Sequence, residues 1–309
     1  MTESAPFLAH HSQAFKASPF YYKNESAYQQ WKVTKLAHYP TTINQLIVPI
    51  SNPKQLTTIE LQQLKDLLLK TNMVIYAIEG ELGRQADKSI PEHIGRQLGI
   101  SALDKNECAD ADGFTSIQVV DTGLHAIYIP YSNKGINWHT DGYYNHLSEQ
   151  IYSMILHCVR PAQEGGDNKL WDPDIIYMML RDKNPDYIKA LMSANAMTIP
   201  KNVLDGQLIR PDRSGPVFMI TQNGRLHMRY SARQRNVIWH NDALTQEAQQ
   251  VLRALLDRPS EYQFQGRLAT GQGLICNNVL HTRSTFKDDP KQPRLLYRGR
   301  YFDMIKQSV

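Results

Sequence analysis

The sequence contains no apolar run that approaches the ~20 consecutive residues of a membrane-spanning helix. Its first residues lack a basic stretch followed by an apolar core, so we expect no secretory signal. Cysteine is scarce, because only Cys108, Cys158 and Cys276 occur, widely spaced and without a CxxC pair. This spacing argues against a disulfide framework and against a zinc ribbon. These absences favour a protein with reduced thiols in the cytoplasm.

A strong charge imbalance is also missing. The 34 basic and 30 acidic residues leave a formal net charge of +4, which suits an anionic small molecule as well as a nucleic acid and decides neither. There is no internal repeat, low-complexity tract or Pro/Gly/Ser-rich linker that would divide the 309 residues. We therefore expect one α+β domain over residues 45–309, with residues 1–44 as an N-terminal extension packed on it.

The first part of that domain shows alternating strand and helix patterns. Thr57 and Glu60 have the spacing of a capping box, and leucines follow them on one helical face. The pattern predicts, in order, a strand at 46–51, a helix at 57–70, a strand at 73–78 and a short helix at 90–100.

From Phe114 onward, short apolar segments alternate with Gly, Pro, Asn and Asp. Many short strands at this spacing are typical of an antiparallel sandwich or barrel. The predicted strands lie within 125–131, 151–159, 215–220, 224–230, 261–268, 271–281 and 294–303. Helical patterns interrupt them at 173–192 and 245–257.

A possible metal site begins at "NWHTDGYYN", where His139 and Asp141 are two positions apart. On a strand such residues point to the same side, so both could face one ion. His281, in "CNNVLHTRSTF", would be the third ligand, at the end of an apolar strand that follows a Gly-x-Gly turn. Two imidazoles and one carboxylate suit non-haem iron and leave coordination positions for substrates. A pair of this kind also occurs by chance, and an isolated histidine beside a strand is often a hydrogen-bonded core residue.

Four segments, in order, resemble the taurine dioxygenase (TauD) family of Fe(II)/2-oxoglutarate-dependent oxygenases. They are the helix and strand of "LTTIELQQLKDLLLKTNMVIYAIEG", then "GINWHTDGYY", "RPAQEGGDNKLWD" and "LHTRSTFKDDPKQPRLLYRGRYFD", and the likeness runs from about Leu46 to Asp303. "HTDGYY", "GRLHMRYSARQRNVIW" and "NNVLHTRSTF" are also similar to the glutarate 2-hydroxylase branch of that family, from which we infer no substrate.

The resemblance implies a double-stranded β-helix (jelly-roll, cupin-like) core with flanking helices. It implies Fe(II) held by His139, Asp141 and His281, with 2-oxoglutarate and O2 as cosubstrates. By the same match, Arg294 would bind the far carboxylate of 2-oxoglutarate, since a guanidinium pairs with a carboxylate through two hydrogen bonds. Arg298 would bind the prime substrate or share the cosubstrate, and the two arginines, four apart on a strand, would share one face. Asn168 stands where the family often has a threonine that contacts the cosubstrate.

Residues around the HxD pair are candidates for contact with the substrate. Tyr143, Tyr144 and Trp138 could line a pocket, although aromatic residues at such places are as often part of the core. "GRLHMRYSARQRNVIW" carries four arginines without an acidic residue, which suggests recognition of an anionic group or a solvated edge with salt bridges. These arginines are Arg225, Arg229, Arg233 and Arg235.

The sequence thus predicts hydroxylation or desaturation of a small, carboxylate-bearing or otherwise anionic molecule, without a nucleic-acid or membrane partner. A homo-oligomer is left open. A zinc hydrolase using the same three ligands is an alternative, but it gives Arg294 and Arg298 no purpose. A nucleic-acid binder using the arginine run is another, which the small net charge disfavours. A protein-directed hydroxylase with the same chemistry also remains open.

Overall fold

The computed structural model describes residues 7–10, 12–233 and 237–306. It mixes helices with many short strands, so the chain belongs to the α+β class. The chain divides into two compact units. One comprises Met1–Tyr39, Trp138–Gln150 and Trp171–Ser260, and the other comprises Pro40–Asn137, Ile151–Leu170 and Glu261–Val309. In the residues described, no helix is both long and apolar enough to span a membrane.

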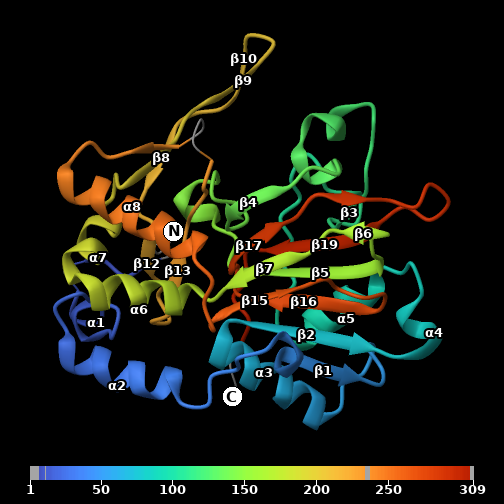
Figure 1. Cartoon of the computed structure of the whole chain (residues 1–309), viewed down its shortest axis with the longest axis horizontal. Coiled ribbons are helices and arrows are strands. Elements are labelled where there is room, and N and C mark those ends of the chain that lie inside the picture. The colour runs from blue at the N-terminus through green and yellow to red at the C-terminus, as the bar shows by residue number, and fades with distance from the viewer. Residues whose placement is uncertain (1–6, 11, 234–236, 307–309) are drawn as a thin grey trace, which may run out of the picture. The chain divides into compact units, whose positions relative to one another are not determined.

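The second unit is built on a six-stranded sheet of order β1-β2-β16-β5-β19-β3 (Figure 1). β1 and β2 are parallel, and the pairs from β2 through to β3 are antiparallel. The strands are β1 (Ile47–Ile50), β2 (Met73–Ile78), β3 (Thr115–Ile117), β5 (Ser153–Arg160), β16 (Gln272–Cys276) and β19 (Leu295–Tyr301). The helices of this unit are η1 (Ile43–Leu46), α3 (Thr58–Thr71), α4 (Gly80–Gly83), α5 (Ser89–Gln97), η2 (Leu124–Ile127) and η3 (Ile129–Tyr131).

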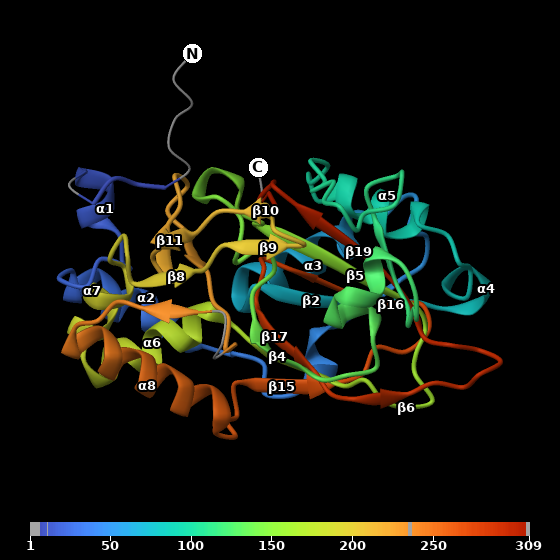
Figure 2. The ribbon, with the colours of Figure 1, turned by 90° about the horizontal axis from the view of Figure 1, so that it is seen from above.

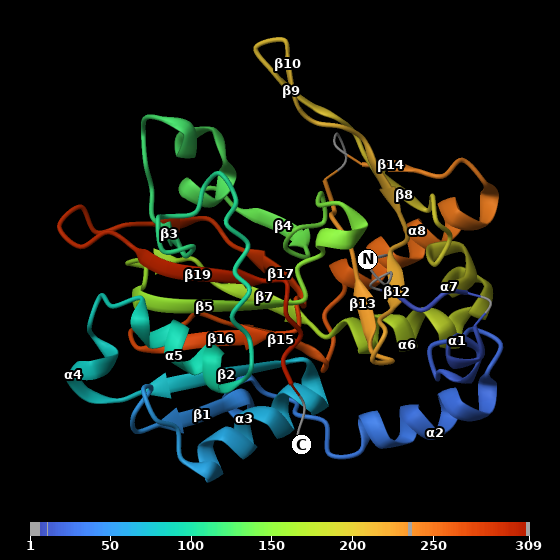
Figure 3. The ribbon, with the colours of Figure 1, turned by 180° about the vertical axis from the view of Figure 1, so that it is seen from behind.

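The helices α3 and α5 cover one face of this sheet (Figure 3). Leu64 and Leu68 of α3 and Ile94 of α5 are almost wholly buried against it. Their apolar partners on the strands include Val74, Tyr76, Ile78, Ile155, Ile275 and Tyr301. Burial of this apolar surface is the main stabilising contribution of the unit.

A second sheet has the order β15-β7-β17-β4, and a two-stranded sheet pairs β6 with β18. These strands are β4 (Ile136–His139), β6 (Glu164–Gly165), β7 (Asn168–Trp171), β15 (Gln263–Gly266), β17 (Leu280–Arg283) and β18 (Phe286–Lys287). Leu170 of β7 and Ile75 and Leu274 of the six-stranded sheet line one cavity of about 290 Å³. The free face of the larger sheet therefore faces the smaller one across this cavity.

The first unit combines helices with small sheets, of order β11-β8-β14, β10-β9 and β12-β13. Helices α6, α7 and α8 pack against one another (Figure 2). The helices are α1 (Gln13–Ala17), α2 (Glu25–Leu36), η4 (Leu147–Glu149), α6 (Pro173–Lys183), α7 (Pro185–Leu191) and α8 (Ala243–Asp257). The strands are β8 (Met197–Ile199), β9 (Asn202–Leu204), β10 (Gln207–Arg210), β11 (Arg213–Gly215), β12 (Phe218–Ile220), β13 (Leu226–Met228) and β14 (Ile238–Trp239).

The N-terminal segment packs against α6 through polar contacts. The Tyr28 hydroxyl donates to Asp182 at 2.5 Å, and Lys35 forms ion pairs with Asp172 at 2.8 Å and Asp174 at 2.6 Å. Burial alone would lower the pKa of Lys35, but the two carboxylates outweigh it and raise that pKa. The ammonium group therefore stays charged in the interior.

Three predictions of local structure were wrong. Residues 125–131 form two 3₁₀ turns, η2 and η3, instead of a strand, and Pro130 at the start of η3 lacks the N–H that a ladder needs. The segment 271–281 is two strands, because Asn278 adopts a left-handed conformation with φ 50°. The helical pattern 173–192 is two helices, since Asn184 caps α7 and Pro185 follows it at the first helical position.

The predicted capping box of α3 is confirmed. The Glu60 carboxylate accepts from the backbone N–H groups of Thr57 and Ser51, both at 2.7 Å, and from both hydroxyls. Burial acts to raise the pKa of Glu60, but these hydrogen bonds outweigh it and lower the pKa from 4.5 to about 2. The three cysteines are free thiols.

Arg229 acts as an anchor of the first unit. Its guanidinium lies in the interior, and 1% of the residue is exposed. Its nitrogens donate to the main-chain oxygens of Tyr143 at 2.8 Å, Met197 at 3.0 Å, Gly215 at 3.3 Å and Arg213 at 2.6 Å. Burial, and then the charge of Arg210, lower the pKa of Arg229 to about 10, so it remains protonated at neutral pH. One side chain thus ties three segments together: the turn after β4, β8 and β11.

We predict that Glu60→Gln lowers the free energy of unfolding at pH 7 by about 1 kcal/mol, the usual contribution of a cap. Because the folded pKa is depressed, the stabilisation by the carboxylate is full above pH 4.5 and is lost as the pH falls toward about 2. Urea unfolding across this range should give a flatter profile for the variant. Glu81→Gln, at an exposed position, is the control, and an equally flat profile there would contradict the assignment.

We predict that Arg229→Met destabilises the protein by more than about 3 kcal/mol, because several buried carbonyls lose their donor. The exposed Arg258→Met should change stability by less than about 0.5 kcal/mol. Urea denaturation at neutral pH measures both. Equal midpoints for the two variants would show that Arg229 is not a structural anchor.

Candidate metal centre

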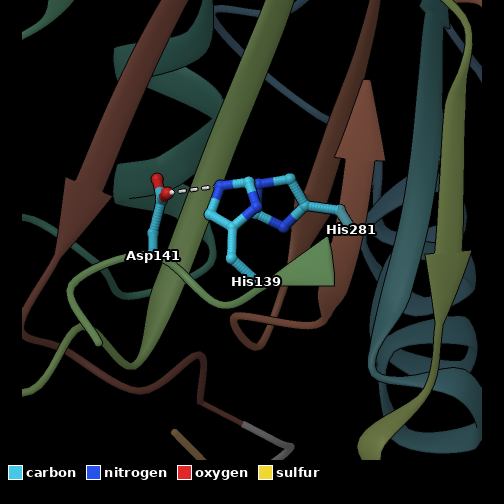
Figure 4. A group of neighbouring side chains, drawn as sticks. All are labelled: His139, Asp141 and His281. Carbon is cyan, nitrogen blue, oxygen red and sulfur yellow. Dashed lines mark ion pairs between the residues drawn. The ribbon is translucent and has the colours of Figure 1, made fainter. Parts of the chain in front are cut away.

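The HxD segment lies where β4 ends. The strand stops at His139, and Asp141 lies in the turn beyond it, so the prediction that both ligands alternate along one strand was wrong. Gly142, with φ 66°, continues the turn. The turn nevertheless brings Asp141 Oδ1 to 3.6 Å from His139 Nε2 (Figure 4).

Main-chain pairing with residues 230–232 holds this segment. Thr140 N donates to Tyr230 O at 3.0 Å, and its hydroxyl accepts from Tyr230 N at 3.1 Å. Ala232 N donates to Trp138 O at 2.8 Å, and Ser231 forms a β-bridge with His139. Because both neighbours of His139 are bonded in this way, its backbone is fixed on either side.

His281 is the second residue of β17, which lies beside β4 in the four-stranded sheet. The prediction that it ends the preceding apolar strand was wrong, since that strand stops at Cys276. His281 Nδ1 lies 3.0 Å from Val279 O. A carbonyl can only accept, so Nδ1 carries the proton and the lone pair of the neutral ring is on Nε2. Such a bond orients a histidine for metal ligation.

The structure brings the three predicted ligands together. His139, Asp141 and His281 each offer a donor atom, and these atoms lie within 4.8 Å of one another (Figure 4). Asp141 is buried, whereas both histidines are partly exposed. Two imidazoles and one carboxylate at this spacing fit a facial triad for Fe(II), which leaves coordination positions open.

Arg298 lies within β19 and Arg294 immediately precedes it, so the prediction that both lie on one strand was wrong. Arg294 is buried, with 6% of its surface exposed, and stacks over Phe286 at 5.0 Å. In the described part of the chain, no carbonyl or carboxylate accepts a hydrogen bond from its guanidinium. Burial lowers the pKa of Arg294 to about 10. Arg298 is half-buried, and its charge acts on Tyr131.

Arg283, two residues after His281, is a neighbour of Arg294 and Arg298 that the sequence did not reveal. Its guanidinium donates to main-chain oxygens of the loop before β4, those of Ile129, Pro130, Ser132 and Lys134. Burial, followed by the charges of Arg294 and Arg298, lowers the pKa of Arg283 to about 9. The three arginines therefore lie close enough to act on one another, and the only signal in the sequence was the position of Arg283 in "HTRSTF".

Asn168, the first residue of β7, donates through Nδ2 to Thr282 O at 2.7 Å. This bond joins it to the residue that follows His281, and Asn168 also lines the 290 Å³ cavity. The amide donor is thus engaged with β17. Contact between Asn168 and a cosubstrate stays a prediction.

The residues proposed for substrate contact differ in burial and in their hydrogen bonds. Tyr143 is buried and Tyr144 half-buried, with ring centroids 5.2 Å apart, and Trp138 is buried. Arg229 must be reassigned, because its donors are bonded to main-chain oxygens and cannot also face a ligand. Arg225 and Arg233 are partly buried, and Arg235 lies outside the described residues.

Comparison with known proteins identifies the family of this chain. Residues 32–300 match the model of the "Taurine catabolism dioxygenase TauD, TfdA family". A uridine-5'-phosphate dioxygenase from Amycolatopsis sp is 33% identical over 183 residues, covering 57% of this chain and 64% of that protein. The chain therefore matches less than two thirds of the length of this curated relative.

Solved structures share the fold at low identity. An asparagine oxygenase in complex with Fe(II), a hydroxyasparagine and succinate has a TM-score of 0.54 at 14% identity, over 81% of this chain and 85% of that one. A taurine dioxygenase from Burkholderia xenovorans has a TM-score of 0.54 at 16% identity, over 83% and 86%. Since the family model covers most of the sequence, the chain belongs to the TauD/TfdA family of Fe(II)/2-oxoglutarate-dependent dioxygenases.

Proposed function

We propose that this protein hydroxylates a C–H bond of a small anionic metabolite, using O2 and 2-oxoglutarate. One oxygen atom enters the product and the other enters succinate, with release of CO2. The observation that carries the proposal is the convergence of His139, Asp141 and His281 in a chain where, among the described residues, the buried guanidinium of Arg294 forms no ion pair or hydrogen bond. Membership of the TauD/TfdA family supports the same reaction.

The three ligands would hold Fe(II), which supplies the activation of O2 and the oxidation of the C–H bond. Asp141 contributes one negative charge from a buried position, and the two imidazoles contribute neutral donors. The bond from His281 Nδ1 to Val279 O keeps the ring in the tautomer that ligation requires. A zinc hydrolase could use the same donors, but it would leave Arg294 without a role.

Arg294 would bind the far carboxylate of 2-oxoglutarate. A buried guanidinium without an acceptor is costly, and a carboxylate would satisfy it with two charge-assisted hydrogen bonds. Arg283 and Arg298 strengthen the positive potential there, since the charges of Arg294 and Arg298 both act on Arg283. Arg298 remains the alternative residue for binding this carboxylate.

The metabolite is proposed to carry a phosphate. The curated relative is named for uridine-5'-phosphate, and a second such dioxygenase, from Streptomyces sp, is 29% identical over 187 residues. Uridine 5'-monophosphate is therefore the first substrate to test. It is a candidate and not an assignment, because the match spans under two thirds of each relative. The likeness to the glutarate 2-hydroxylase branch stays a prediction, and it makes glutarate the alternative.

The finer architecture is also part of the proposal. The six-stranded and four-stranded sheets that line one cavity are the two halves expected of a double-stranded β-helix. We further infer a single oxygenase domain over residues 45–309. The free thiols of Cys108, Cys158 and Cys276 support a cytoplasmic location.

We predict that His139→Ala, Asp141→Ala and His281→Ala each lower succinate formation more than a hundredfold, because each removes a ligand of the iron. Anaerobic addition of Fe(II) and 2-oxoglutarate should give a charge-transfer absorption band with the native protein and none with these variants. His240→Ala, at an exposed histidine, is the matched control. Full turnover by the Asp141 variant would show that the ligand assignment is wrong.

We predict that Arg294→Lys raises the KM for 2-oxoglutarate about ten- to hundredfold, because a lysine keeps the charge but loses the bidentate pairing. Fe(II) binding should be unchanged, since Arg294 is not a ligand. Steady-state succinate release measures the KM, with Arg298→Lys in parallel. An unchanged KM for the first variant and a raised one for the second would transfer the role to Arg298.

A further inference from the structure

Three arginines gather around the tyrosines that follow Asp141. The charge of Arg210 acts on Tyr143, on Tyr144 and on Arg213, and that of Arg233 acts on Tyr143. All five residues belong to the first unit. We call Arg210, Arg213 and Arg233 the cationic cluster.

The scaffold fixes this cluster relative to the HxD turn. The guanidinium of Arg229 donates to both Tyr143 O and Arg213 O, so these two main-chain segments are held together by one planar group. Arg233 follows the segment that pairs with β4, and its N–H donates to the Ser231 hydroxyl at 3.4 Å. Ser231 itself forms the β-bridge with His139. The main chain at Arg233 is therefore held at a fixed position relative to His139, the first candidate metal ligand.

The protein offsets the charges of the cluster only in part, through Asp212, whose charge acts on Arg210. In the residues that the structure describes, neither Arg213 nor Arg233 forms an ion pair or a side-chain hydrogen bond, and Arg213 Nε is buried without an acceptor. The guanidinium of Arg210 is bonded to the main-chain oxygens of Ile199, Pro200 and Pro211. The neighbouring carboxylate, Asp212, is exposed and accepts from Lys201 N.

Like charges held together in this way are costly. Burial, and then the charge of Arg213, lower the pKa of Arg210. An anion beside Arg213 and Arg233 would accept from their guanidinium groups, and its charge would also offset the repulsion between Arg210 and Arg213. The cluster thus has the properties expected of an anion site rather than of a structural network.

There is room beside the cluster for the rest of a ligand. Arg233 lines a cavity of about 150 Å³, whose walls include Tyr230, Trp239, Gln249 and Arg253. The aromatic rings offer faces for a planar or sugar-like group, and Arg253 adds a fourth positive charge. Asp257, one turn further along α8, acts on Tyr230 and is the acidic group on this side.

We propose that the cationic cluster binds the phosphate monoester of the substrate, which rests on the proposed function and names the chemistry that selects its substrate. A phosphate monoester carries a charge of about −1.5 to −2 at pH 7 and three strong acceptor oxygens. A carboxylate has one charge and two oxygens, so it would leave part of the cluster unpaired. Phosphate therefore suits the charge and the free donors of the cluster better than the carboxylate that the sequence alone suggested.

The test is equilibrium binding without turnover. Calorimetric titration of the full chain, free of iron and 2-oxoglutarate, compares uridine 5'-monophosphate, uridine and glutarate. We expect the native protein to bind the phosphate at least tenfold more tightly than uridine or glutarate. Arg213→Gln and Arg233→Gln should each weaken the phosphate about ten- to hundredfold and leave uridine unchanged. Arg258→Gln, at an exposed arginine, is the matched control.

The outcomes separate this inference from the proposed reaction. Uridine binding by each variant, with its circular dichroism, shows whether it is folded, and Arg213→Lys should recover part of the affinity if charge is what matters. If uridine and its phosphate bind equally, if glutarate binds as tightly as the phosphate, or if the cluster variants lose no more than Arg258→Gln, the phosphate site is refuted. Succinate formation could still stand in that case. Phosphate-dependent binding without succinate formation would support the site and refute the reaction.

Discussion

The hydrogen bonds that join residues 138–140 to residues 230–232 position most of what we describe. They end β4 at His139 and leave Asp141 in a tight turn, so that an imidazole and a carboxylate converge outside a regular strand. The same pairing sets the position of Arg233, since it follows the paired segment directly. A change that loosened this ladder would therefore disturb the metal ligands and the cationic cluster together.

The buried arginines fall into two groups, which differ in whether main-chain carbonyls accept hydrogen bonds from the guanidinium group. Arg229 and Arg283 are buried, and their guanidinium groups are bonded to main-chain carbonyls, so they act as fixed struts between segments. Arg294 is equally buried but has no such acceptor in the described residues, and the same is true of the side chain of Arg213. Since a buried donor without an acceptor is costly, we propose that ligands pair with Arg294 and Arg213, whereas Arg229 and Arg283 serve the fold.

The sequence predicted well where local chemistry determines the structure. Thr57 and Glu60 are three residues apart and form their capping box within one turn of helix, so no distant contact is needed. Prediction from the sequence failed where a contact with a distant residue determines the local conformation. Asn278 interrupts the apolar segment because its amide donates to Ile151 O, more than a hundred residues earlier in the chain. The three candidate ligands were identified because their residue types and order resemble those of a family, although the local geometry inferred for Asp141 and His281 was wrong.

The arginines show most clearly what sequence cannot resolve. Arg229 and Arg233 lie in one basic run of the sequence. Their spacing does not indicate which guanidinium donates hydrogen bonds to main-chain carbonyls. That difference arises because β11 and the turn after β4 place main-chain oxygens around Arg229 alone. Net charge is equally uninformative, since an excess of +4 over 309 residues conceals two separate groups of three arginines. The reaction that we propose uses two anions, a cosubstrate and a substrate, and it would need concentrated local charge rather than a basic composition.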